Sequence, residues 1–138
     1  LKNDGIYRFS LFGYPEWTGY AEYYPFFKKV NTTVFSRYAI INSDKATKEF
    51  NTRFKYWYGE KPLKSVPEMA PLGYDLGSYF IRTGKATHND FNMQTSDFNG
   101  LQTALSMQRV SNWGGFVNSA IYLINYAPSG TTTKSVIR

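Results

Sequence analysis

The chain has 138 residues, of which 42% are hydrophobic and 19% are aromatic, and it carries a formal net charge of +6 at pH 7. This length suits one domain of ordinary size, and the aromatic content argues for a packed globule and against intrinsic disorder. No uncharged apolar stretch approaches the roughly 20 residues that a membrane-spanning helix needs, and the lack of cysteine excludes disulfides, thiol catalysis and thiolate metal sites.

The first third of the sequence predicts a strand, a helix and a second strand. Residues 6–12 form a nearly continuous apolar run that ends at Gly13, which is typical of a strand covered on both faces. Apolar side chains recur at helical spacing over 20–30, so we expect a helix in which Pro25 lies in the first turn or causes a kink. Residues 33–41 are rich in β-branched and aromatic side chains and predict a second strand.

An amphipathic helix is expected next. Residues 42–44 offer several N-cap side chains, and Gly59 is placed to end the helix. The apolar stripe between these limits has four members: Ala46, Phe50, Phe54 and Trp57. Their spacing predicts one face that packs against the rest of the protein.

A loop and another helix follow. Residues 60–71 contain three prolines and predict a loop, and a second apolar stripe then predicts a helix over 72–84. Gly73 and Gly77 lie four residues apart in this helix and suggest tight packing against another backbone.

The C-terminal part changes to strand periodicity. Residues 85–100 are polar and predict a loop. Alternating side chains and flanking turn residues then predict an antiparallel meander of 107–110, 115–126 and 132–137. The expected fold is therefore a single α/β domain over 1–138, with strand, helix, strand, helix and helix followed by a β-meander.

Four local segments resemble a known family. Phe54-Lys55-Tyr56-Trp57-Tyr58-Gly59 and Ala70-Pro71-Leu72-Gly73-Tyr74-Asp75 are similar to the aromatic helix and the Gly-Tyr-Asp helix of type I periplasmic solute-binding proteins. Residues 11–17 and 109–118 look like stretches of the solute-binding-like modules in Bacteroidetes envelope proteins, many of which carry an upstream LysM domain. The order of elements agrees with the C-terminal part of that fold.

The resemblance implies a place in the cell envelope. The chain would be the C-terminal fragment of a longer solute-binding-like protein that is periplasmic or held by a lipid anchor through its missing N-terminal part. The start at Leu1 without a methionine fits that expectation. In complete relatives two lobes close over a ligand, so this fragment would keep only part of the cleft or need a partner chain, such as a second copy, to cover exposed sheet edges.

A ligand-binding loop is expected beyond the first strand, where ligands collect in open α/β sheets. Tyr14, Trp17 and Tyr20 would stack on an apolar or sugar face, and Glu16 would fix a polar or cationic group. The alternative is that Trp17 fills the core while Pro15 and Glu16 only begin a helix. Arg37, within a β-prone run, would reach a ligand carboxylate or else form a salt bridge.

Other polar residues have plainer explanations. Asp75 is expected to accept hydrogen bonds where a loop meets a helix. His88, Asp90 and Asp97 lie in the polar loop without the spacing of a metal or EF-hand site. No phosphate-binding glycine loop, nucleophile elbow or zinc-ligand pattern is visible, so we expect no catalytic residue, no cofactor and no metal.

The excess of positive charge does not by itself indicate a partner. It can attract nucleic acid, anionic lipid or acidic glycan, but the central lysines are spread out and alternate with Glu49 and Glu60. This favours a solvated face, without nucleic-acid binding. We expect a non-enzymatic ligand-recognition or scaffold module for a small molecule, amino acid, peptide or muropeptide. The alternatives are a protein-interaction domain, which would form a homodimer across the meander, and a cell-wall hydrolase whose carboxylates meet only in the fold.

Overall fold

The computed structural model describes residues 9–86 and 97–138 and shows a mixed α/β chain whose C-terminal strands are antiparallel. The chain forms two compact units. The first unit consists of Leu1–Arg37 and Ile121–Ile137, and the second consists of Tyr38–Ala120 and Arg138. Each unit buries its own set of side chains, and the single domain expected from the length stays a prediction.

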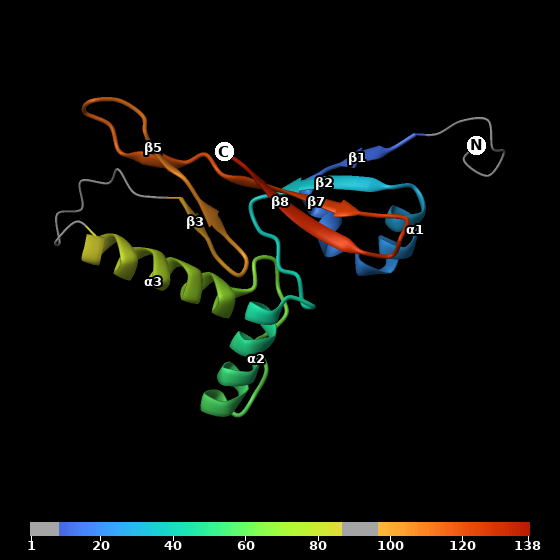
Figure 1. Cartoon of the computed structure of the whole chain (residues 1–138), viewed down its shortest axis with the longest axis horizontal. Helices are drawn as coiled ribbons and strands as arrows, with labels where there is room; N and C mark the ends of the chain where they lie inside the picture. Colours follow the sequence, from blue (N-terminus) through green and yellow to red (C-terminus); the bar gives the residue numbers. More distant parts are fainter. Residues whose placement is uncertain (1–8, 87–96) are drawn as a thin grey trace. The chain divides into compact units, whose positions relative to one another are not determined.

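A four-stranded sheet forms the first unit (Figure 1). Its strands are β1 (Leu11–Gly13), β2 (Thr32–Ser36), β7 (Ile121–Tyr126) and β8 (Thr132–Ile137), in the order β1-β2-β7-β8. β1 runs parallel to β2, and the other two pairs are antiparallel. Burial alternates along β2 and β7, so that Val34, Ile124 and Tyr126 are covered while their sequence neighbours are only half-buried. One face of these strands therefore holds the core of the unit.

Three short helices accompany this sheet, and one of them adds a buried side chain to the core. They are η2 (Pro15–Gly19), η3 (Ala21–Tyr23) and α1 (Tyr24–Lys29). Phe27 of α1 is buried, and its ring centroid lies 5.6 Å from that of Tyr126 on β7. Pro25 occupies the first turn of α1, which confirms one of the two expected places. The helix is shorter than predicted because residues 21–23 form a separate 3-10 turn and Tyr20 lies outside any helix.

The first two strands are also shorter than the sequence suggests. β1 begins at Leu11, and residues 6–8 of the predicted strand lie outside the described residues. β2 ends at Ser36, and beyond it Tyr38 makes an isolated antiparallel bridge with Thr103 in the second unit. The predicted extension of this strand to residue 41 is therefore wrong.

Two helices open the second unit. α2 (Lys45–Tyr58) ends at Gly59, whose φ of 76° is the left-handed conformation that glycine adopts without strain. This helix and its end are confirmed. α3 (Met69–Ala86) begins three residues before the predicted start, because Pro71 lies in its first turn, where no intrahelical N–H is needed.

The predicted close packing at the two glycines of α3 is wrong. Within the described part of the chain, a β-carbon built on Gly73 or Gly77 would meet no atom within 4 Å apart from the helix's own backbone. Both glycines are exposed, so they lie on a face of α3 that no other backbone approaches.

The second unit also contains two small hairpins. One pairs β3 (Phe98–Asn99) with β4 (Ala104–Leu105), and the other pairs β5 (Met107–Arg109) with β6 (Phe116–Asn118). The 98–99 strand lies in the stretch predicted as a loop. The core of this unit is a cluster of Tyr79, Phe98 and Leu105.

The sequence predicted one strand over 115–126 as part of a single meander. The structure instead has two strands there, β6 and β7, so this prediction is wrong. β6 belongs to the second unit and β7 to the first. The side chain of Asn118 explains the break, because its Oδ1 accepts hydrogen bonds from the N–H groups of Ser106 and Ala120 while its Nδ2 donates to the Ala104 carbonyl. An amide side chain thus occupies backbone groups that a continuous ladder would pair.

Candidate functional site

The predicted binding loop lies in the first unit, and its rings contact different neighbours. Trp17 is half-buried and stacks on Phe27, with ring centroids 5.5 Å apart and an interplanar angle of 12°. The ring of Tyr14 instead meets the edge of Phe35 at 6.4 Å, and Tyr20 meets Tyr23 at 6.3 Å. The structure therefore places the three predicted rings along one segment without gathering them around a shared partner.

Trp17 lies against the core residue Phe27 but is itself only half-buried. A β-carbon on Gly13 would overlap the indole ring, so the ring lies directly over the β1 backbone. Pro15 occupies the first turn of η2, and Glu16 is exposed there. Tyr14 and Tyr20 are exposed, as is Arg37, which follows the end of β2.

Asp75 has the structural role that the sequence predicts. It is fully buried in α3 and accepts hydrogen bonds from three successive N–H groups, those of Leu101 at 2.7 Å, Gln102 at 2.8 Å and Thr103 at 2.9 Å. Gln102 in turn exchanges two hydrogen bonds with the backbone of Glu68. The carboxylate of Asp75 therefore holds a turn against α3.

No metal site emerges from the residues that the structure covers, 9–86 and 97–138, where no three histidine, aspartate or glutamate side chains gather. His88 and Asp90 lie outside those residues. Asp97 is paired with Arg138, whose Nε lies 2.9 Å from its Oδ2.

An aromatic hollow separates α2 from α3. It has a volume of about 560 Å³, and we call it the α2–α3 groove. Its lining comes mainly from one face of α2 and the first half of α3: Ala46, Glu49, Phe50, Arg53, Phe54, Trp57, Tyr58, Met69, Ala70, Gly73, Tyr74 and Leu101. Two of the lining rings, those of Phe50 and Tyr74, have centroids 5.2 Å apart and so connect the two helices.

The apolar stripe of α2 therefore lines an open groove. Thr47 is the buried residue of this helix, whereas Trp57 and Tyr58 are 75% and 71% exposed. The sequence predicted the stripe correctly but indicated a core contact, because helical spacing does not distinguish a buried face from a groove wall. An exposed aromatic group of this kind marks a binding surface more often than isolated exposed residues do.

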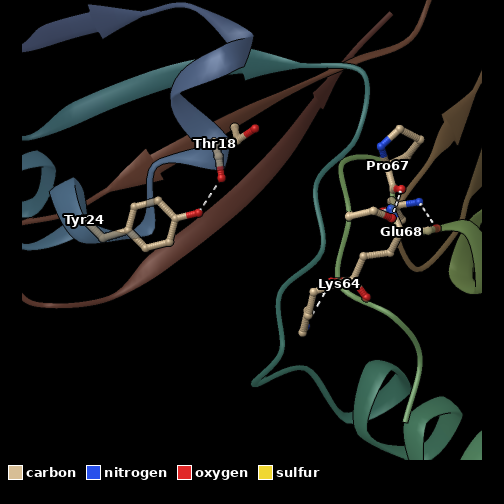
Figure 2. A network of polar contacts seen from close by, with 7 residues as sticks. Thr18, Tyr24, Lys64, Pro67 and Glu68 are labelled. Atoms are coloured by element: carbon tan, nitrogen blue, oxygen red, sulfur yellow. Dashed lines mark hydrogen bonds and ion pairs between the residues drawn. The ribbon is translucent and has the colours of Figure 1, made fainter.

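A second hollow lies on the opposite face of α2. It has a volume of about 940 Å³, and we call it the lysine groove. Its lining combines α2 with the loop before α3: Asn42, Lys48, Asn51, Thr52, Lys55, Tyr56, Lys61, Pro62, Lys64 and Glu68. Lys64 Nζ lies 2.9 Å from the Oε1 of Glu68, a pair that Figure 2 shows beside Pro67. These lysines are dispersed along the sequence, and the fold brings them together around one groove.

No known protein family, curated protein or solved structure matches the chain. Among the described helices, none is both long and apolar enough to cross a bilayer.

Proposed function

We propose that the chain is a non-enzymatic ligand-recognition or scaffold module of the bacterial cell envelope, and that the α2–α3 groove holds its ligand. The observation that carries this proposal is the aromatic wall of the groove. Phe54, Trp57 and Tyr58 form one side of an open hollow, with Tyr74 on the other. Rings in such a position bind the apolar part of a ligand with little loss of side-chain entropy.

The charges in the groove favour a particular ligand class. Its lining includes one acid, Glu49, which has a long and exposed ion pair with Lys45 at 3.8 Å, and one base, Arg53, and otherwise consists of aromatic, aliphatic or small residues. A single carboxylate and a single guanidinium beside apolar rings suit a ligand that carries both an amine and a carboxylate. An amino acid, a short peptide or a muropeptide has those groups.

The family resemblance supports the same binding site, the α2–α3 groove. The segments 54–59 and 70–75, which are similar to type I solute-binding proteins, contribute six of the residues that line the groove: Phe54, Trp57, Tyr58, Ala70, Gly73 and Tyr74. The proposal therefore includes a fold related to the C-terminal part of those proteins and an address in the envelope. A second proposed contact surface lies in the first unit and consists of Tyr14, Glu16, Trp17, Tyr20 and Arg37.

A thermal-shift screen of amino acids, muropeptides and neutral sugars tests the proposal. At a ligand concentration about 100 times the Kd, binding should stabilise the fold by about 2.7 kcal/mol. Trp57→Ala should abolish the shift, whereas Trp113→Ala should keep it. Trp113 is fully exposed on the β5–β6 hairpin and does not line the groove, so it is the matched control. An undiminished shift in Trp57→Ala would show that the groove is not the site.

A protein-interaction role is the second candidate. The observation that favours it is the exposure of large apolar side chains on the β5–β6 hairpin, with Val110 at 65% and Trp113 at 101%. Exposed tryptophan is a frequent anchor of protein interfaces. Sedimentation at increasing protein concentration should then show a dimer that Trp113→Ala dissociates, and a monomer at all concentrations would contradict a homodimer.

A further inference from the structure

The lysine groove concentrates positive charge in one place. Lys48 and Lys55 reach it from α2, and Lys61 and Lys64 from the loop that follows. The ion pairs of the described chain include Lys64 with Glu68 but none with the other three lysines of the groove. Three lysines without an ion pair thus line a hollow whose one carboxylate is already paired.

The uncharged lining of this groove is polar. Asn42 and Asn51 supply amide groups that both donate and accept hydrogen bonds. Thr52 donates its hydroxyl proton to the Lys48 carbonyl at 2.9 Å, which leaves its oxygen as an acceptor. Tyr56, 79% exposed, supplies one aromatic face. The lining therefore suits a ligand that is anionic and also rich in hydroxyl groups.

We propose that the lysine groove binds an acidic oligosaccharide, one whose sugar units carry carboxylate groups. The carboxylates pair with Lys48, Lys55 and Lys61, the sugar hydroxyls bond to the asparagine amides, and a sugar ring lies on Tyr56. The volume of about 940 Å³ lies in the upper part of the range of small-ligand sites, roughly 300–1,000 Å³.

The single ring argues for sugar and against single-stranded nucleic acid. Proteins that bind single strands offer a succession of aromatic side chains on which consecutive bases stack. The lysine groove offers Tyr56 alone, whereas the other aromatic residues of α2 face the α2–α3 groove or its rim. The inference is separate from the proposed function, because the two grooves lie on opposite faces of the same helix.

Fluorescence anisotropy with a labelled oligogalacturonate tests the inference. The triple variant K48Q/K55Q/K61Q should bind at least about tenfold more weakly than the unaltered chain, because three charge pairs are lost. The control K28Q/K29Q/K85Q removes the same net charge at places outside the groove and should bind as the unaltered chain does. The triple arginine variant at 48, 55 and 61 should keep the binding, because it keeps the three positive charges.

Two further probes decide the ligand class. A fully methyl-esterified oligogalacturonate of the same length, which has no charge, should not bind, and added salt should weaken the acidic probe. Equal weakening by the groove and control variants would overturn the inference, since it would reveal only non-specific attraction. The inference would also be overturned, in favour of nucleic acid, if a single-stranded oligonucleotide of equal charge bound more tightly than the oligogalacturonate and lost that binding in the groove variant. Trp57→Ala should leave the binding of the acidic probe unchanged. A failure of this inference can therefore be told apart from a failure of the function proposed for the α2–α3 groove.

Discussion

Asp75 and Gly100 approach each other so closely that a β-carbon on residue 100 would overlap the carboxyl group of Asp75. The approach lets the carboxylate reach the N–H groups of the next three residues, 101–103, while Gly100 donates its own N–H to the Thr103 carbonyl at 2.8 Å. The β3–β4 turn is therefore fixed to α3 by one buried side chain.

Replacement of Asp75 by asparagine should destabilise the fold by about 2–4 kcal/mol. Asparagine keeps one acceptor oxygen but turns an NH₂ group towards backbone N–H donors, so buried donors lose their partner. Chemical denaturation measures the loss. Asp44→Asn is the control, because Asp44 is exposed and makes no side-chain capping hydrogen bond, and should change stability by less than about 0.5 kcal/mol. Similar stability of both variants would contradict the role of Asp75.

Gly100→Ala should be costly, whereas Gly77→Ala should be favourable. The added methyl group at 100 would force the Asp75 carboxylate away from its three donors, so we expect a loss of about 2 kcal/mol or more. At residue 77 the methyl group enters open space on a helix, where alanine exceeds glycine by about 0.5–1 kcal/mol. Thermal unfolding of the two variants should therefore move Tm in opposite directions.

The helices of the second unit and the last strand could be predicted because local signals coincide there. Gly59 ends α2 as its position indicated, and residues 132–137 form β8 as the alternation suggested. The division of the strand at Ser119 could not be predicted, because it depends on the Asn118 side chain meeting residues 104 and 106, whose positions only the fold sets.

The candidate site shows a similar limit. The sequence identified the aromatic stripe of α2, but whether a neighbouring element covers that stripe is a tertiary property. The lysine groove was hidden for another reason. Lys48 and Lys55 lie on the helix face opposite to the stripe, and the proline loop returns Lys61 and Lys64 to that face. From their spacing along the chain alone, these four lysines are expected to be dispersed over the surface.

Trp17→Ala should test whether the predicted binding loop serves the core or a ligand. The stacking on Phe27 and the contact with Gly13 predict a loss of about 3 kcal/mol in unfolding free energy. Tyr14→Ala should cost less than about 1 kcal/mol, because Tyr14 is 66% exposed. Urea denaturation of both variants gives the comparison, and equal small losses would favour the ligand-binding interpretation of Trp17.

Tyr126 should make the stability of the first unit fall at alkaline pH. Burial raises the pKa of its hydroxyl above the usual value of about 10, and the neighbouring Tyr24 hydroxyl raises it further through charge and a hydrogen bond. The Tyr24 hydroxyl itself donates to the Thr18 carbonyl at 2.6 Å (Figure 2). The folded state thus keeps the Tyr126 proton at a pH where the unfolded chain releases it.

The sign follows from that difference in bound protons. Above about pH 10 the folded chain binds more protons at Tyr126 than the unfolded chain does, so the free energy of unfolding decreases by up to about 1.4 kcal/mol per pH unit. Below that pH the contribution is constant. Tyr126→Phe should remove this slope, while Tyr14→Phe, at an exposed position, should keep it. Urea titrations between pH 8 and pH 11, compared with those of both variants, isolate Tyr126 from the lysines, since all three chains share the same lysines. Parallel curves for Tyr126→Phe and the unaltered chain would contradict the raised pKa.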